Sequence, residues 1–519
     1  MFYNNRSIVW MTAIILVLGT AMSLSGLTMH DHGEEHQHGE VNFPISCNAE
    51  AQDRFETGLA HLHHMMYEQA RPEFEAAAEA DPNCAMAYWG IAMSSFQPLW
   101  HPTTDEGMER GKKAVKKAKE LGAPTEREQK YIAAVDAFFT DPYPPKESRT
   151  RDHVARIEQW KPAQREIHEA YPDDVDAAAF YGLAEVCYAV AQFSPDEEHD
   201  YSRERMAGAL MEEYFENHPE HPGLFHYIIH AYDSSELAHK ALKYAREYDK
   251  LAPTTPHALH MPSHIFVRLG KWEETADWNE RSAEAAWNQI DFDDHASAHY
   301  VHALDYAMYA YLQMGDREKA RETLERVQNV DEVYAAPFSG YNLAAPQARY
   351  YLEQRKWEEA AELEPGKPEV LPWENYPEAM ALFSYARGLG AARTGDLNLA
   401  QTEREKISGY VKSLFDAGNE YWGYMNKALG QAVEAWTLYE KGETEQALTL
   451  MREAAELEES MDKSPITPGE ILPVRELYGD LLLREGRTDE ALRAYEKSLE
   501  RTPNRRNAER GMERATALR

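Results

Sequence analysis

The fold of this chain is decided by three segments: FHYIIHAYD at residues 225–233, LHMPSHIF at 259–266 and HASAHYVHALD at 295–305. Each carries two histidines four residues apart, and equivalent histidines recur after 34 or 35 residues: His226, His260 and His295 in the first position, His230, His264 and His299 in the second. On a helix, residues four apart lie on one face, so each pair predicts two imidazole rings one turn apart. The period predicts that this face repeats on successive helices.

A period of 34 residues is typical of tetratricopeptide repeats, which are helix pairs that stack into an α-solenoid. Pro219 and Pro253 recur at this period and predict helix ends. No segment shows strand-like alternation of useful length. We therefore predict an all-α protein, a right-handed superhelix of helix pairs, with a polar capping helix near its C-terminus at 507–518.

These signals divide the chain into seven ranges. They are a signal peptide or signal anchor at 1–29, a flexible tail rich in histidine and acidic residues at 30–42, N-terminal repeats at 43–140, a proline-rich loop at 141–150, central repeats with a histidine-lined concave face at 151–361, a second proline-rich loop at 362–376, and C-terminal repeats with the cap at 377–519.

The N-terminal segment predicts export. Arg6 is the only charged residue before an apolar run that starts at Ile8, and Ala21-Met22-Ser23 offers a small-x-small cleavage site. The alternative is an uncleaved anchor, because residues 8–27 are long enough to span a bilayer. The membrane is a partner only through this segment.

Export gives the cysteines a role, because disulfides persist in oxidising compartments. Cys47 precedes the first predicted helix, and Cys84 follows the helix that packs back on it. The two residues therefore lie at the same end of a helix pair, and we expect a Cys47–Cys84 disulfide. Cys187 is flanked by apolar residues and is expected to be buried.

The overall charge restricts the partners. The chain has 54 Lys+Arg against 89 Asp+Glu, a formal net charge of −35. A surface this acidic repels phosphate backbones, which argues against nucleic acid as a partner. Cations and basic peptides remain compatible with it.

Several blocks of the chain resemble a widespread group of exported bacterial tetratricopeptide-repeat proteins. The blocks are FPISC at 43–47, AMAYWGIAM at 85–93, HYIIHAYD at 226–233, PHALHMPSHIFVRLG at 256–270 and PVRELYGDLLLREGR at 473–487. The resemblance spans residues 43–511. It implies the repeat fold and export from a bacterial cytoplasm, so that the protein is periplasmic, secreted or anchored to the inner membrane. The group has no settled biochemical activity, so the resemblance implies no function.

In such arrays the first helix of each repeat lines the concave surface, and the histidines fall at positions that face this groove. The predicted groove residues are His226, His230, His257, His260, His264, His295, His299, His302, Tyr227 and Tyr232. Aromatic and histidine side chains make an adaptable surface for a protein or peptide, which is the function that the sequence favours.

Two other interpretations stay open. Neutral imidazoles bind zinc or copper, and the best ligand set is His226, His230, His260 and His264, with Asp233 as a direct or indirect oxygen ligand. Alternatively, the histidines hydrogen-bond to backbone carbonyls that Pro262 leaves unpaired. A metal-dependent enzyme is the less expected case, because HExxH, GxSxG, CxxC and phosphate-cradling motifs are absent.

Overall fold

Prolines and glycines begin and end the helices that matter for the site. Pro222 and Pro256 occupy the first turns of α9 (Pro222–Ala231) and α11 (Pro256–His260), where a missing N–H costs no hydrogen bond. Gly315 ends α14 (Ala296–Met314) in the left-handed conformation, with φ of 75°. An L side chain rarely adopts this conformation, so glycine is the residue that fits this helix end.

The computed structural model describes residues 38–100, 102–191, 199–289 and 295–519, and within these ranges every regular element is helical. The N-terminal helices are α1 Ala49–His63, α2 Tyr67–Ala80, α3 Ala85–Met93, α4 Asp105–Leu121, α5 Glu126–Phe139, α6 Arg149–Ala170, α7 Val175–Ala191 and α8 Ser202–Phe215. After α9 come α10 Ala238–Ala245, the 3-10 helix η1 Tyr248–Lys250, α11, α12 Pro262–Arg268, α13 Trp272–Trp287, α14, α15 Arg317–Gln328, α16 Pro337–Glu353 and α17 Trp357–Ala361. The C-terminal elements are η2 Trp373–Asn375, α18 Pro377–Thr394, α19 Leu397–Asp416, α20 Glu420–Glu440, α21 Thr444–Glu459, α22 Val474–Arg484, α23 Thr488–Arg501 and α24 Arg506–Ala517.

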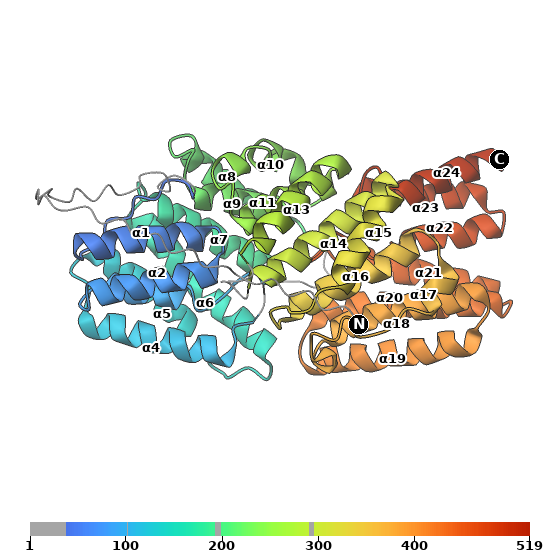
Figure 1. Cartoon of the computed structure of the whole chain (residues 1–519), viewed down its shortest axis with the longest axis horizontal. Coiled ribbons are helices and arrows are strands. Elements are labelled where there is room, and N and C mark those ends of the chain that lie inside the picture. Colours follow the sequence, from blue (N-terminus) through green and yellow to red (C-terminus); the bar gives the residue numbers. More distant parts are fainter. Residues whose placement is uncertain (1–37, 101, 192–198, 290–294) are drawn as a thin grey trace, which may run out of the picture. The chain divides into compact units, whose positions relative to one another are not determined.

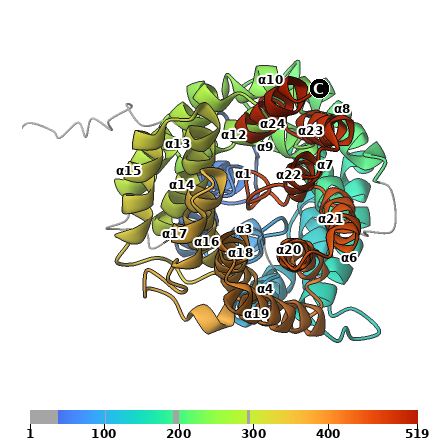
Figure 2. The same cartoon turned by 90° about the vertical axis from the view of Figure 1, so that its right-hand side faces the viewer.

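Most helices pack against their neighbours in sequence, which is the contact pattern of a solenoid (Figure 1). The pairs α1·α2, α6·α7, α13·α14, α18·α19 and α22·α23 contact each other, and so do the helices that link one pair to the next. Figure 2 shows α18 to α24 following one another around the C-terminal end of this arrangement. The apolar core has two main parts, one formed by residues in the range 43–278 and the other by residues in the range 283–515.

The C-terminal part also packs back on the middle of the chain. The capping helix α24 contacts α14 as well as α23. Arg505, fully buried, donates to Tyr309 of α14 at 2.6 Å and pairs with Glu476 at 2.6 Å. Arg349, also fully buried, binds Asp305 of α14 and the Gly469 carbonyl. These contacts hold the connection between α21 and α22, residues 460–473, against α14 and α16.

Two features of the N-terminal region bear on the predictions. Cys47 and Cys84 form a disulfide, which joins the chain before α1 to the residue that precedes α3. The predicted signal segment at 1–29 and most of the predicted tail lie outside the described residues. The end of that tail is packed: His64 contacts the His38 carbonyl, and Phe43 is buried against Trp89. Among the described residues, none of the helices combines the length and apolarity needed to cross a membrane.

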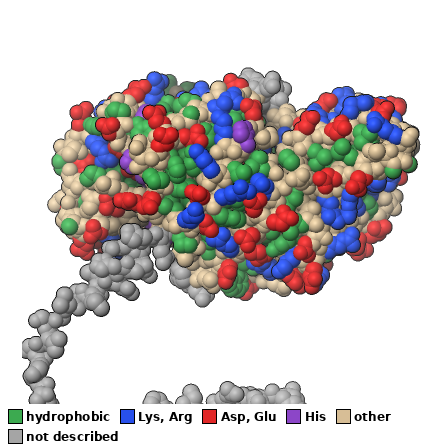
Figure 3. All heavy atoms as spheres, turned by 90° about the horizontal axis from the view of Figure 1, so that it is seen from above, with side chains coloured by type: hydrophobic (Ala, Val, Ile, Leu, Met, Phe, Trp, Pro, Cys, Tyr) green, Lys and Arg blue, Asp and Glu red, His purple; other side chains and the backbone are tan. Residues whose placement is uncertain are grey.

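The surface in Figure 3 mixes acidic and basic side chains, although the chain as a whole is acidic. Many of these charges are paired, such as Arg156 with Asp152 and Arg326 with Glu280. The proline-rich stretches are connections: α6 begins only at Arg149, and residues 362–372 carry no helix.

Candidate functional site

Seven histidines from four helices meet in the interior. Helix α9 carries His226 and His230, and α11 and α12 carry His257, His260 and His264. The other two, His299 and His302, lie on α14. Pro262 divides α11 from α12 because it lacks the N–H that would continue the helix. The hydroxyl of Ser263 donates to the His260 carbonyl at 2.6 Å and satisfies this group at the end of α11.

The seven side chains are buried, with exposed fractions between 0% for His226 and 8% for His302. From the sequence we expected them to line an open groove. In the structure the chain itself covers most of this groove, because Trp100, Phe338 and the Pro465–Ile466 pair from residues 460–473 pack beside the rings. A cavity of about 30 Å³ remains among them, and Trp100, His230, Pro465 and Ile466 also line a larger pocket of about 650 Å³.

Six of the seven histidines form two groups of three, and within each group the ligand atoms all lie within 4.8 Å of one another, whereas His299 belongs to neither group. We call His260, His264 and His302 the α12 trio, and His226, His230 and His257 the α9 trio. The four histidines expected to form one metal site are therefore divided between two, because each helical pair meets its third ring from another helix. The third ring of the α12 trio, His302, comes from α14, and the third ring of the α9 trio, His257, comes from α11.

In the α12 trio, hydrogen bonds fix which ring nitrogens carry protons. The Asn279 amide donates to the Thr275 carbonyl at 2.7 Å, so its oxygen faces His260 Nδ1 at 2.8 Å and accepts a hydrogen bond from it. His264 Nδ1 donates to Asp233 Oδ2 at 2.8 Å. A neutral imidazole has only one N–H, so both Nε2 atoms present lone pairs.

These two Nε2 atoms face each other at 3.0 Å. Burial lowers the pKa of His260 well below its ordinary value, with His302 and His264 acting in the same direction, and burial also lowers the pKa of His264. Both rings are thus neutral at neutral pH, and no proton lies between the two lone pairs. Two imidazole ligands of one tetrahedral zinc have nitrogens about 3.3 Å apart, because each Zn–N bond is about 2.0–2.1 Å. The pair is arranged as metal ligands are.

Asp233 supports the α12 trio without entering it. It lies 2.9 Å from Arg268 Nε and 2.8 Å from Lys463 Nζ, and all three side chains are buried. Burial by itself would raise the pKa of Asp233, but Lys463 and Arg268 together hold it well below its ordinary value. The carboxylate is therefore ionised and fixes the tautomer of His264, the role that carboxylates commonly have behind metal-bound histidines.

Three residues predicted for the groove take other roles. Tyr227 is buried with its hydroxyl 3.1 Å from His63 Nδ1, and Tyr232 donates to Glu212 at 3.0 Å. His295 precedes α14 and stacks near Tyr334, outside both trios. Of the seven clustered histidines, His226 binds a backbone carbonyl, donating from Nδ1 to the His63 oxygen at 2.7 Å.

A third polar group was not predicted from the sequence. His63 Nε2 and His221 Nε2 lie 2.8 Å and 3.2 Å from the same Asp176 oxygen. His221 Nδ1 accepts from the Leu224 N–H, so its Nε2 carries the proton and donates to Asp176. Both histidines bind the same Asp176 oxygen, whereas its other oxygen is buried without a hydrogen-bond partner among the described residues. His221 lies 45 positions from Asp176 in the sequence and His63 lies 113 positions from it, and no local sequence pattern pairs these residues.

Comparisons with known proteins agree with the repeat fold. Residues 302–330 and 473–505 match the tetratricopeptide repeat. No curated protein matches the sequence. Similar solved structures include human IFIT1 with m7Gppp-AAAA, at 14% identity over 80% of this chain and 87% of that chain with a TM-score of 0.37. Yeast Tom70 has 11% identity over 90% and 95% with a TM-score of 0.33, and the APC/C Cut9–Hcn1 hetero-tetramer 11% over 90% and 96% with 0.30. TM-scores this low indicate no close agreement in overall arrangement.

The two matched segments coincide with helix pairs, since 473–505 covers α22 and α23 and 302–330 covers most of α14 and α15. The chain therefore contains tetratricopeptide repeats at these two segments. Arrays of such repeats form extended surfaces that bind other proteins, so the fold supports an interaction scaffold as the general class of function.

Proposed function

We propose that this protein binds a transition-metal ion through the α12 trio. The observation that carries the proposal is the pair of Nε2 atoms of His260 and His264, which face each other at 3.0 Å while both Nδ1 atoms donate to fixed acceptors. Two buried lone pairs in this position repel each other unless a cation lies between them. A metal ion bound by both nitrogens removes the repulsion.

The third ring completes a facial set of ligands. The ring centre of His302 lies 4.2 Å from that of His260, and its Nδ1 is buried without a hydrogen-bond partner. Three neutral imidazoles with no directly bound carboxylate favour zinc or copper over magnesium or calcium, which prefer oxygen ligands. His264 and His302 also line the small cavity, so an exogenous ligand there would lie next to an ion bound by the trio.

The test uses the full chain with His30, His32 and His36 changed to alanine, so that these three histidines of the predicted tail contribute no ligands. After loading with Zn²⁺ alone and dialysis, elemental analysis is expected to find bound zinc. His302→Ala is expected to weaken zinc binding at the α12 trio by at least 100-fold. The matched control is His295→Ala, which alters a histidine just before the same helix that is outside the trio and whose side chain is 23% exposed.

Cobalt(II) provides a second readout, because its visible absorption reports the coordination geometry. We expect a tetrahedral spectrum in the parent protein and in His295→Ala, and its loss in His302→Ala with unchanged circular dichroism. Zinc that stays bound at full affinity in His302→Ala, or a parent protein that takes up no zinc, refutes the proposal.

An interaction scaffold is the second candidate, favoured by the repeats at 302–330 and 473–505. A peptide in the groove would have to displace Pro465 and Ile466, so a partner is better placed on the outer surface. Binding of a protein partner that is unaffected by His302→Ala and by metal would support this role as separate from the metal site.

Export is part of the same proposal. The apolar run that begins at Ile8 and the disulfide between Cys47 and Cys84 both support an oxidising compartment outside a bacterial cytoplasm. Mass spectrometry of the mature protein tests this, because a cleaved signal peptide predicts an N-terminus shortly after Ser23. An intact N-terminus on protein from the membrane fraction would instead support the anchor at 8–27, and an intact one on cytoplasmic protein would refute export.

A further inference from the structure

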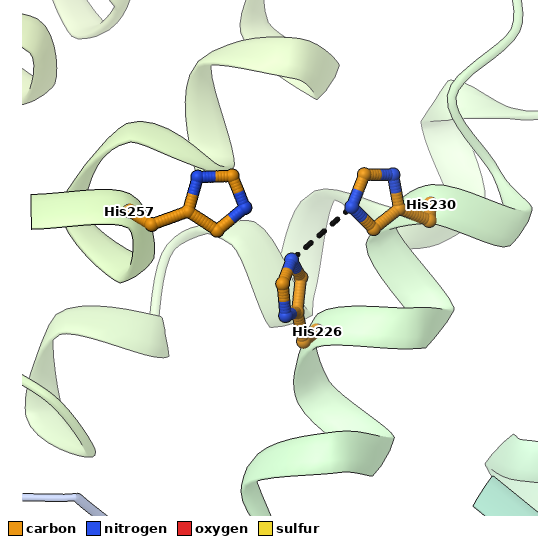
Figure 4. A group of neighbouring side chains, drawn as sticks. All are labelled: His226, His230 and His257. Carbon is orange, nitrogen blue, oxygen red and sulfur yellow. Dashed lines mark hydrogen bonds between the residues drawn. The ribbon is translucent and has the colours of Figure 1, made fainter. Parts of the chain in front are cut away.

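The α9 trio lies on the opposite side of the same small cavity. Its three rings come from α9 and α11 and face a common space, with His226 Nε2 and His230 Nε2 3.1 Å apart (Figure 4). His226 Nδ1 donates to the His63 carbonyl at 2.7 Å, so in the neutral ring Nε2 presents a lone pair to this space. One ligand atom of this trio is therefore fixed in the same way as in the α12 trio.

His257 is the residue that points to a bound ion. Its side chain is buried, yet neither ring nitrogen has a hydrogen-bond partner. An unsatisfied buried polar group destabilises the fold, so each one in a native structure needs an explanation such as a bound ion or water. The ring centre of His257 lies 5.0 Å from that of His226, and its ligand atom lies within 4.8 Å of those of His226 and His230. A metal ion would satisfy a nitrogen that no protein group reaches.

The cavity belongs to both trios. His230 and His257 line it from one side, and His264 and His302 from the other. The two sets adjoin, since the ring centres of His230 and His264 are 5.8 Å apart and those of His257 and His260 are 6.0 Å apart. A water molecule needs about 10–15 Å³, so a cavity of about 30 Å³ holds one or two. Any ligand in it would contact both sites at once.

We infer that the two trios hold two metal ions that share one small exogenous ligand in this cavity: water, hydroxide or an anion of two or three atoms. The inference rests on the proposed function, because it adds a second ion to the site of the first. In other two-metal sites the ions lie about 3.5–4 Å apart and clamp a common oxygen ligand. Trp100, Phe338 and Ile466 line the shared position and leave space there for a ligand of this size.

Each trio contains a histidine that can be removed with little loss of hydrogen bonding. His257 has no partner at either nitrogen, and His302 has none at Nδ1. His257→Ala and His302→Ala therefore form a matched pair that tests the two sites separately. The parent is again the full chain with His30, His32 and His36 of the tail replaced by alanine.

The experiment is loading with Cu²⁺ alone, followed by elemental analysis and electron paramagnetic resonance. We expect two copper ions per chain in the parent and one in each single variant. In the parent, azide in the shared cavity is expected to couple the two Cu²⁺ spins, so that the integrated signal falls well below two spins per chain. In His257→Ala the one remaining ion is expected to give a full signal of one spin that azide does not diminish.

The outcomes separate the two proposals. One ion per chain in the parent, unchanged in His257→Ala and lost in His302→Ala, overturns the second site and leaves the proposed function standing. Two ions whose signals stay at two full spins with azide overturn the shared ligand. A parent protein that is folded by circular dichroism and binds neither copper nor zinc overturns both proposals. The measurements on the parent do not depend on whether His257→Ala or His302→Ala folds.

Discussion

The most informative perturbation is Asp233→Asn, because Asp233 joins the α12 trio to the segment that covers it. The substitution keeps the shape of the side chain and removes its charge. In the native protein this carboxylate contacts Arg268, Lys463 and His264 at 2.8–2.9 Å, all out of contact with bulk water. Arg268 keeps its ion pair with Asp462 at 2.6 Å, but Lys463 loses the one ion pair it makes among the described residues.

The magnitude follows from this arrangement. Removing one partner from a buried ion pair costs about 3–5 kcal/mol of unfolding free energy, because the other charge stays buried. Burial lowers the pKa of Lys463 to about 8 even with Asp233 opposing the shift. Without Asp233 the pKa falls further, so Lys463 becomes neutral near pH 7 and limits the loss to about 3 kcal/mol. The folded variant then binds fewer protons than the unfolded chain, and its stability must rise with pH.

The assay is urea denaturation of the metal-free protein at pH 6 and pH 9, followed by circular dichroism. We expect the destabilisation by Asp233→Asn to be larger at pH 6 than at pH 9. The control is Asp462→Asn, which also contacts Arg268 but is 30% exposed, and we expect it to cost about 1 kcal/mol or less. A loss below about 1 kcal/mol in Asp233→Asn, or equal losses in the two variants, would refute the reasoning.

Three further predictions concern other parts of the molecule. Replacing Cys47 and Cys84 with serine should lower the unfolding free energy by about 4 kcal/mol, because the disulfide closes a loop of 37 residues; an unchanged melting temperature would contradict this. Burial raises the pKa of Glu378 to about 7, so the unfolded chain releases its proton first and stability falls by about 3 kcal/mol between pH 4.5 and pH 7. In Glu378→Gln this part of the pH dependence should disappear, and calorimetry that shows the same slope in both proteins would contradict the assignment. Ile466→Ala should enlarge the shared cavity so that imidazole reaches the copper-loaded site, whereas the parent admits azide alone; visible spectra that change with imidazole in both proteins would disprove the size limit.

The local sequence was sufficient to predict the helices and the pairing of the histidines. The spacing of four between His226 and His230 places both rings on one face of α9, and Pro262 ends α11 where a helix cannot continue. The position of Cys47 and Cys84 at one end of a helix pair predicted the disulfide for the same reason. Each of these inferences depends on residues close in sequence or on the repeat period.

The tertiary structure alone decided what the histidines face. Lys463 meets Asp233 across 230 residues, and Ile466 closes the cavity over rings from α11, α12 and α14. The period placed the histidines on one surface and gave no information about a distant connection that covers it. Packing of residues 460–473 therefore converts an expected open groove into two buried trios, because burial and ligand geometry depend on contacts between segments that the repeat pattern does not relate.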